Sequence, residues 1–267
     1  MSIIQSGVAK VAQGSVNALA QVGMIFQLFA NIVRSTFRRP FQFREFIEQS
    51  WFIASVTILP TALVAVPFGA IVSLQTGSLI GQLGAESFTG AASVLAVVQQ
   101  GAPVVTALLV AGAAGSAVCA DLGARTVREE IAAMEVLGID PVHRLVVPRV
   151  LGMMLVSALL NGLVSVVGVV GGYFFNVVLQ HGTPGAYLAS FSALAQLPDL
   201  LVGELKALVF GLIAGVVAAY KGLNPGGGPK GVGDAVNQSV VITFLLLFFA
   251  NIILTAVYLQ IVPAKGS

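Results

Sequence analysis

The chain has 267 residues, of which 57% are hydrophobic and only 9% are charged, with a formal net charge of +2. A typical soluble domain carries roughly 25% charged residues, so this composition excludes an ordinary soluble domain and indicates a polytopic membrane protein. The single cysteine, Cys119, excludes a disulfide framework within one chain.

The first apolar segment, residues 14–33, is predicted to lie along the membrane surface rather than to form a sixth span. Its amides fall on one side of a helical wheel, which Lys10 and Arg38 extend: Asn17, Gln21, Gln27 and Asn31. A one-sided helix followed by arginines is typical of an interfacial helix. Pro40 is expected to end it. The segment does not read as a cleavable signal peptide, because amides interrupt its apolar run.

Five later segments are long and apolar enough to cross a bilayer as helices, which takes about 20 residues each. They cover approximately 51–75, 93–121, 145–180, 199–221 and 237–262. Runs of this length without two-residue alternation favour helices over barrel strands. The sequence predicts an all-α integral membrane protein with one domain over 1–267. Residues 1–49 would be cytoplasmic or interfacial, and residues 50–262 would form the transmembrane bundle.

The basic residues are confined almost entirely to one side of these spans. They precede the first span and lie between spans two and three and spans four and five: Lys10, Arg34, Arg38, Arg39, Arg44, Arg125, Arg128, Arg144, Arg149, Lys221 and Lys230. The opposite loops, at about 76–92 and 181–198, contain no lysine or arginine. The positive-inside rule therefore predicts a cytoplasmic N-terminus and, with five spans, an extracytoplasmic C-terminus. The chain is expected in the plasma (inner) membrane.

Small residues and prolines inside the spans are interpreted first as features of helix packing. Rows at four-residue spacing let helix backbones approach closely: Ala107, Ala111 and Gly115; Ala207, Gly211 and Gly215; Gly168 and Gly172. Pro60 and Pro67 are expected to kink the first span.

Several polar residues within or near the spans allow more than one interpretation. Lys206 could reach the outer interface, or it could face a pocket and attract an anionic lipid head group, whereas Glu204 should face another side of the helix. Asp121 is expected to pair with Arg125, and Asn161 to bond between helices. Glu86 is interpreted as an exposed loop carboxylate rather than a partner contact.

The loop Asp121–Arg149 carries the most distinctive pattern. Residues 125–137 are predicted to form one helix, with Val127, Ile131, Met134 and Leu137 along one side. Gly138 is expected at its C-cap. Asp140 and Pro141 should form the following turn. Such a helix is either a solvated connection or a docking helix for a cytoplasmic partner.

The run Arg128–Pro141, followed by Leu145-Val146-Val147-Pro148-Arg149, resembles the MlaE/YrbE permease family of Mla and Mce lipid transporters. The likeness includes Phe41–Glu45, Gly84–Glu86, Ala111–Gly123 and Lys206–Gly211. The run Cys119–Thr126 is most similar to actinobacterial YrbE proteins of Mce systems. One departure is Gln99–Pro103, where many family members carry Arg-Glu-Leu-Gly-Pro; any role of that ion pair cannot be transferred to this chain.

The resemblance implies an interfacial helix, five spans and a coupling helix between spans two and three, on which a cytoplasmic ATPase dimer docks. The coupling residues would be Arg125, Arg128, Glu129, Glu130, Met134, Glu135, Leu137, Gly138, Asp140 and Pro141. The partners would be a second YrbE-type permease and MCE proteins outside, with a lipid pocket between the permeases. Suggested lining residues are Phe68, Leu74, Leu79, Phe244, Phe248, Ile252 and Lys206. No cofactor is expected on this chain; ATP and magnesium would bind the ATPase.

Two other classes remain as alternatives. An intramembrane enzyme would need a nucleophile with a base, but His143 and His181 lie in loops and Cys119 has no candidate base on its span. A secondary transporter would commonly show repeated halves and mid-membrane acids, and neither is visible. The Gly-rich run Asn224–Gly231 does not match a P-loop and is predicted to be a tight turn. ATP hydrolysis is therefore expected in a separate subunit, and the cargo and transport direction stay open.

Overall fold

The structure is a computed structural model, and it describes residues 20–84, 88–179, 182–194 and 197–261. All regular elements within these ranges are helical, as expected for an all-α membrane protein. Five helical runs are long and apolar enough to span a bilayer: Phe43–Gln82, Gly90–Val127, Val142–Val178, Pro198–Leu223 and Gly228–Tyr258. All five predicted spans are confirmed, and each observed run begins earlier in the chain than predicted because the helix continues past the apolar stretch.

The second span is built from several helical pieces rather than from one regular helix. The elements in chain order are α2 Phe43–Gln82, α3 Thr89–Ser93, η2 Val94–Gly101, α4 Ala102–Leu109, η3 Val110–Ala114, α5 Gly115–Val127, α6 Glu130–Val136, η4 Val142–Val146, α7 Val147–Leu179, α8 Pro184–Leu194, α9 Leu197–Leu223 and α10 Gly228–Ile261. Elements marked η are π-helical turns, which the apolar periodicity did not predict. Such turns occur frequently at functional sites.

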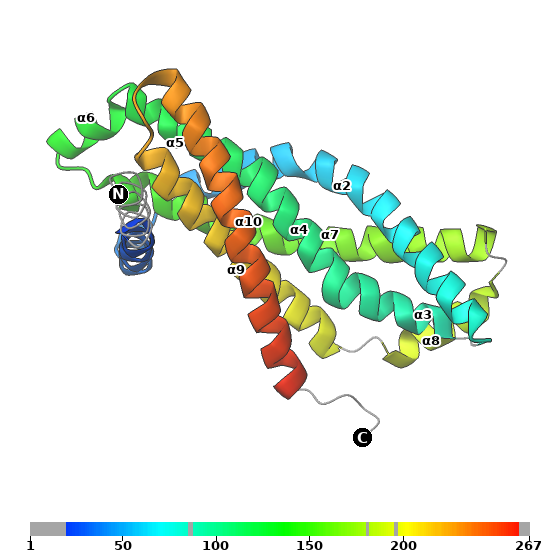
Figure 1. Cartoon of the computed structure of the whole chain (residues 1–267). Coiled ribbons are helices and arrows are strands. Elements are labelled where there is room, and N and C mark those ends of the chain that lie inside the picture. Colours follow the sequence, from blue (N-terminus) through cyan, green and yellow to red (C-terminus); the bar gives the residue numbers. More distant parts are fainter. Residues whose placement is uncertain (1–19, 85–87, 180–181, 195–196, 262–267) are drawn as a thin grey trace, which may run out of the picture.

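Helix α7 is the centre of the bundle, with α2 packed against one side and α9 against another (Figure 1). Helices α5 and α10 pack on α9, whereas α2 and α10 have no extensive contact with each other. The short helices α3 and α8 pack together at the end of the bundle opposite α6 (Figure 1). The two loops without lysine or arginine therefore lie at one end, and the basic loop with α6 lies at the other.

Close helix contacts occur where the small residues were predicted to allow them. A Cβ added at Gly69 of α2 would lie 2.7 Å from the Cα of Gly168 in α7. One added at Gly211 of α9 would lie 2.6 Å from the carbonyl oxygen of Met153 in α7. Contacts this short are forbidden to real side chains. The packing interpretation of the small-residue rows is thus confirmed at these α7 contacts, where only glycine fits.

Helix α2 continues through Pro60 and Pro67 without ending at either one. Its 40 residues make it about 60 Å long at 1.5 Å per residue. A hydrocarbon core is only about 30 Å thick, so a large part of α2 extends beyond the lipid tails or is tilted. At the other end of the chain, residues 224–227 make the predicted tight turn between α9 and α10.

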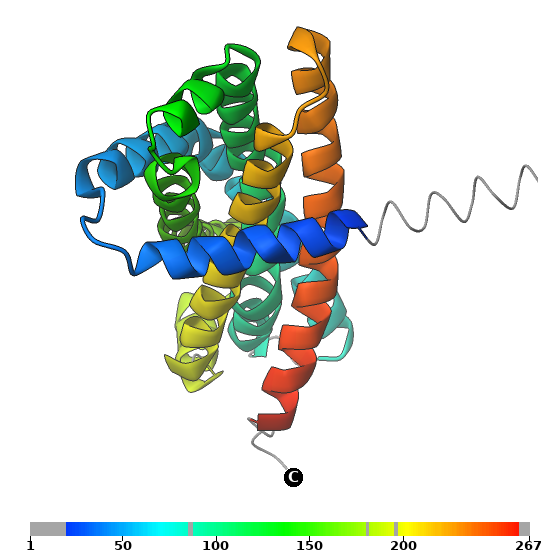
Figure 2. The same cartoon turned by 90° about the vertical axis from the view of Figure 1, so that its left-hand side faces the viewer.

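The helix at residues 20–36, here the N-terminal helix, lies across the long helices rather than parallel to them (Figure 2). Ile25, Leu28 and Ile32 pack on the main core, while Gln27 and Asn31 are exposed. A third side carries an exposed apolar row: Val22, Phe26, Phe29, Val33 and Phe37. This orientation matches the predicted interfacial helix. The helix ends four residues before Pro40, and residues before 20 lie outside the described part.

Candidate functional site

The predicted single helix at 125–137 is wrong, because the chain breaks at Arg128 and Glu129. Helix α5 ends at Val127, and α6 begins at Glu130. Glu129 between them has a φ of 63°, in the left-handed region that non-glycine residues rarely adopt. The apolar spacing continues across the break and therefore gives no sign of it. A glutamate at this position also does not predict a left-handed conformation. The predicted cap at Gly138 is confirmed by its φ of 74°.

Helix α6 projects from the end of the bundle (Figure 1), and its exposed side chains are aliphatic and acidic. The predicted common face is split by the break: Ile131 and Met134 pack on the core, whereas Leu137 is 75% exposed. Val136 beside it is 88% exposed. Glu129 and Glu135 are also exposed. Exposed aliphatic side chains at a projecting helix, next to unpaired carboxylates, are typical of a docking surface for another protein.

Asp140 organises the return of the chain into the third span. Its Oδ1 accepts a hydrogen bond from the backbone N–H of Val142 at 3.0 Å, which caps the helix that begins at Pro141. Its Oδ2 lies 3.3 Å from Nη1 of Arg38 in the segment after the N-terminal helix. The predicted turn at Asp140 and Pro141 is therefore also a link to the N-terminal region.

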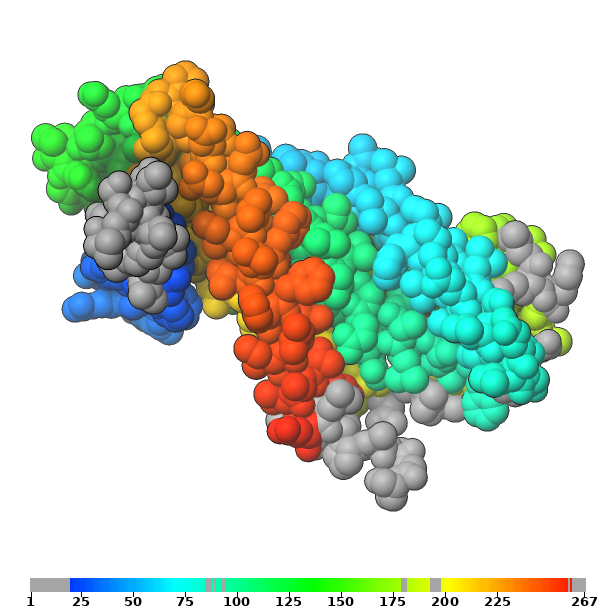
Figure 3. Space-filling view, viewed as in Figure 1, coloured from blue at the N-terminus to red at the C-terminus, as the bar shows by residue number. Residues whose placement is uncertain are grey.

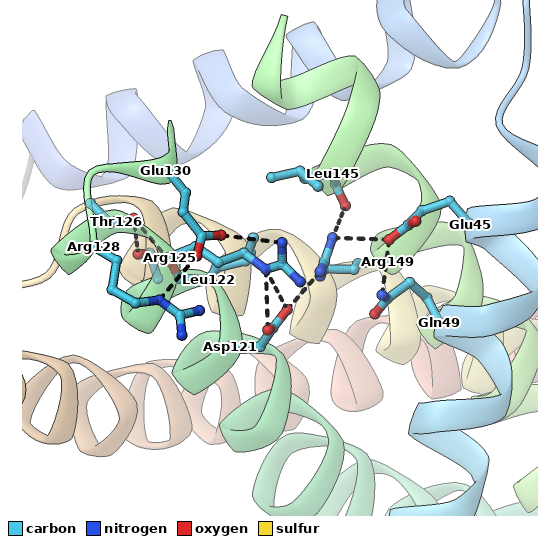
Figure 4. A network of polar contacts seen from close by, with 11 residues as sticks. Glu45, Gln49, Asp121, Leu122, Arg125, Thr126, Arg128, Glu130, Leu145 and Arg149 are labelled. Atoms are coloured by element: carbon cyan, nitrogen blue, oxygen red, sulfur yellow. Dashed lines mark hydrogen bonds and ion pairs between the residues drawn. The ribbon is translucent and has the colours of Figure 1, made fainter. Parts of the chain in front are cut away.

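A network of charged side chains joins α6 to three spanning helices (Figure 4). Arg149 of α7 is completely buried, and its Nη2 lies 2.6 Å from Oδ2 of Asp121 in α5. Its Nη1 donates to the carbonyl oxygen of Leu145 at 2.8 Å and lies 3.8 Å from Oε1 of Glu45 in α2. These three acceptors compensate a buried guanidinium that would otherwise be very costly.

The same network continues outward to α6. Arg125 pairs with Asp121 at 3.2 Å, as predicted, and its Nη1 lies 3.4 Å from Oε2 of Glu130 in α6. Arg128 also pairs with Glu130, at 3.0 Å. Glu130 is therefore held by two arginines, unlike Glu129 and Glu135. A displacement of α6 would act on α5, α7 and α2 through this continuous set of contacts.

The sequence pointed to several members of this network but not to its centre. In the sequence, Arg149 is one of the basic residues of the loop and the last residue of a family-like run, and Glu45 belongs to another such run; neither pattern assigns them a partner. The available signal was an arginine at the start of a long apolar run, directly after Pro148. A buried arginine requires acidic partners, but Asp140 and Glu135 precede Arg149 more closely than Asp121 and Glu45, so the sequence alone does not identify which acids pair with it.

Polar contacts also join the helices inside the apolar region. Lys206 of α9 is buried, and its Nζ donates to Oγ1 of Thr255 in α10 at 2.9 Å. The carbonyl oxygen of Gln99 in η2 lies 3.4 Å from the same Nζ. Glu204 faces α7 instead, where Asn161 donates to it at 3.1 Å. The predictions that Glu204 and Lys206 face different sides and that Asn161 bonds between helices are confirmed.

The suggested pocket residues are not all brought together within one chain. Phe244 and Phe248 of α10 line a small apolar pocket against α4 and α9. Helices α10 and α4 lie side by side (Figure 3). Phe68 of α2 packs in a separate cluster with α4. Leu79 and Ile252 are exposed, and Leu74 is half-buried on α2.

The pocket beside Phe244 holds about 20 Å³, which is little more than one water molecule needs. Binding pockets for small molecules usually enclose about 300–1,000 Å³. One chain therefore does not enclose a lipid at this position. Asn251 also lines the pocket, and its buried side-chain oxygen has no hydrogen-bond partner among the described residues.

The site offers no arrangement suited to a metal. Within the described ranges, no group of three or more His, Cys, Asp or Glu side chains is placed to hold a metal ion. Glu86, named in the sequence as an exposed carboxylate, lies outside the described residues.

Comparison with known proteins identifies relatives over most of the chain. The family model described as permease MlaE matches residues 46–257. A probable ABC transporter permease protein of Rickettsia typhi is 30% identical over 91% of this chain and 94% of its own length. One of Synechocystis is 32% identical, covering 88% of both chains. The chloroplast protein TRIGALACTOSYLDIACYLGLYCEROL 1 of Arabidopsis thaliana is 30% identical over 67% of this chain and 51% of its own length.

Proposed function

The chain belongs to the MlaE permease family, and from that premise we propose that it is the membrane subunit of an ATP-driven lipid transporter. Its relatives are named as ABC transporter permeases, which favours transport driven by a separate ATPase. The plant relative is named after a galactolipid, which favours a lipid cargo. In this proposal the chain performs no chemistry itself, and ATP and magnesium bind the partner.

The observation that carries the proposal is the continuous charge network between α6 and the spans. Glu130 of α6 contacts Arg125, Arg125 contacts Asp121, and Asp121 contacts the buried Arg149. The exposed side chains of Val136 and Leu137 provide an apolar surface that an ATPase can contact. In the proposed mechanism, closure of the ATPases on ATP moves α6, and the network transmits that movement to α5, α7 and α2.

The lipid cavity is proposed to form between two permeases. Helices α2 and α10 have no extensive contact with each other, and the pocket beside Phe244 is too small for a lipid. Helix α10 also has the smallest buried share of the five spans, 11% over its most apolar window. A second permease against these faces would bring Phe244, Phe248, Ile252, Phe68, Leu74 and Leu79 to the walls of one cavity. Lys206 would lie near its outer end.

A finer proposal is that the assembly is of the Mce type in the inner membrane, with the N-terminus in the cytoplasm. Its support is the likeness of Cys119–Thr126 to actinobacterial YrbE proteins and the one-sided distribution of basic residues. In that assembly the second permease is a different YrbE-type chain, and MCE proteins sit on the outer face. The relatives above come from other lineages and do not bear on this subtype.

The first experiment is purification of the chain from its native membrane in mild detergent, with mass spectrometry of the proteins and lipids that accompany it. The proposal expects an ABC-type ATPase, a second permease and an enriched lipid. MCE proteins in the same preparation would support the Mce subtype. Recovery of the chain alone, active in vesicles without ATP but dependent on an ion gradient, would refute the proposal in favour of a secondary transporter.

A further inference from the structure

A second hollow lies outside the network, where the segment after the N-terminal helix meets the loop before α7. Arg38, Arg39 and Gln42 line one wall, and Asp140, His143 and Arg144 line the other. The hollow, here the basic groove, encloses about 520 Å³, within the usual range of ligand sites. Figure 2 shows the turn after the N-terminal helix on the same side of the molecule as the loop before α7.

The two walls are fixed to each other by contacts between residues about a hundred positions apart. Arg38 pairs with Asp140 at 3.3 Å, and Nε2 of His143 lies 3.4 Å from the carbonyl oxygen of Arg38. Arg144 donates to the side-chain oxygen of Gln42. The groove is therefore a formed site and not a gap between independent segments.

The charges of the basic groove do not balance. Asp140 is the only carboxylate among the residues that line the groove, and it already forms an ion pair with Arg38. The guanidinium of Arg144 donates to the neutral Gln42, and among the described residues neither Arg144 nor Arg39 forms an ion pair. Both are exposed, so their guanidinium groups can reach a ligand. Arg39 and Arg144 therefore line the same groove from its two walls, and guanidinium forks are suited to binding a phosphate in a bidentate manner.

The apolar surface beside the groove indicates where such a phosphate comes from. The exposed row on the N-terminal helix runs through Phe26, Phe29 and Val33 to Phe37, which is 82% exposed and directly precedes Arg38. A helix of this kind lies at the level of the lipid head groups, with its apolar side among the acyl chains. A phospholipid can therefore place its tails against this row and its head group in the groove.

We propose that the basic groove binds the phosphate group of an anionic phospholipid from the adjacent membrane leaflet. Arg39 and Arg144 hold the phosphate, and Arg38 is kept in place by Asp140. This site is separate from the proposed transport cavity and lies at the other end of the bundle from α3 and α8. The proposal does not depend on the transport function, because binding can be measured without ATP or partner proteins.

The test uses the full-length chain in vesicles of phosphatidylcholine that contain a minor fraction of phosphatidylglycerol. After mild extraction, native mass spectrometry counts the lipids that stay bound. The double variant R39Q/R144Q is compared with R34Q/R44Q, which removes the same charge from exposed positions of the same region outside the groove. We expect R39Q/R144Q to lose about fivefold of phosphatidylglycerol retention for each arginine removed. R34Q/R44Q should retain it.

The variant R39K/R144K keeps the charge but loses the planar fork, so its retention should fall between wild type and R39Q/R144Q. Equal losses in R39Q/R144Q and R34Q/R44Q would show only diffuse attraction and would overturn the proposal. Displacement of the lipid by inorganic phosphate at equal concentration would assign the site to a soluble phosphate instead. Unchanged lipid retention together with weaker ATPase recruitment in R39Q/R144Q would make the groove part of a protein interface, which also overturns the proposal.

Discussion

Asp121 and Arg149 lie 28 residues apart in the sequence, yet an ion pair of 2.6 Å joins the middle of α5 to the first turn of α7. Arg149 is completely buried, while the side chain of Asp121 is 31% exposed. The pair thus stands at the boundary between the apolar bundle and the loop that carries α6. It links two spans directly, and Glu45 extends the connection to α2.

Replacing Asp121 with Asn should destabilise the bundle by about 2–3 kcal/mol, because a buried guanidinium loses its closest counter-charge. The measurement is the midpoint of thermal unfolding in detergent. The control is Glu48→Gln, which breaks an exposed pair with Arg44 and should change the midpoint very little. If the apolar pair Asp121→Leu and Arg149→Met restores stability, the charge and not the side-chain volume is responsible. Equal midpoints for D121N and wild type would contradict the role of this pair.

Replacing Glu129, Glu130 and Glu135 together with Lys should uncouple ATP hydrolysis from lipid transport without unfolding the spans. Two of these carboxylates are exposed, and the third is held by Arg125 and Arg128, which a lysine would repel. ATPase recruitment and transport by the reconstituted complex are the measurements. Glu48→Lys, an exposed charge reversal away from α6, serves as the control. Unchanged recruitment and transport in the triple variant would refute the coupling-helix assignment.

Two substitutions of Glu129 can separate the contribution of its backbone conformation to stability and coupling from the contribution of its carboxylate. Its φ of 63° is strained by about 1 kcal/mol for any residue with a Cβ, so Glu129→Gly should raise stability slightly. Glu129→Ala removes the same carboxylate but keeps the strain. If the carboxylate contacts the ATPase, both variants should lower coupling equally; if only the turn matters, Glu129→Gly should couple as well as wild type.

The glycine contact between α2 and α7 should tolerate no side chain. Gly69→Ala would place a Cβ 2.7 Å from the Cα of Gly168, so the helices must separate at a cost of about 1–3 kcal/mol. Gly81→Ala is the matched control on the same helix, because nothing lies within 4 Å of its Cβ. It should be neutral or stabilise by up to about 1 kcal/mol. Thermal unfolding of the two variants side by side tests the packing.

Lys206→Met should lower transport of anionic lipids far more than it lowers stability. The lysine is buried with Thr255 and the carbonyl oxygen of Gln99 as its hydrogen-bond partners, so an apolar replacement removes a costly charge. Transport of anionic and of neutral lipids by the reconstituted complex is compared, with Thr255→Val as the control for the lost hydrogen bond. An equal decrease for both lipids, accompanied by a lower unfolding midpoint, would assign Lys206 a structural role.

The spans could be predicted from the sequence because their apolar runs are long and the bilayer sets a minimum length. The loop geometry could not be predicted in the same way. The break at Glu129 depends on how α5 and α6 must be placed relative to each other, which is a property of the whole fold. A glutamate gives no local signal for such a break. The π-helical turns of the second span could not be predicted either, because residues 94–114 are almost uniformly apolar and a shift in helical phase leaves no visible change in their pattern. The central role of Arg149 could not be predicted, since its acidic partners Asp121 and Glu45 come from two distant helices, α5 and α2.

The only cysteine gives the chain a practical property. Cys119 is fully buried in the main core beside Gly222, so water-soluble maleimides should not reach it in the folded protein. A cysteine introduced at Val136 on α6 or at Arg39 in the basic groove would then react alone, without prior removal of the native thiol. Spin labels or fluorophores at those two positions could follow the movement of α6 relative to the bundle during ATP turnover, in an otherwise unaltered protein.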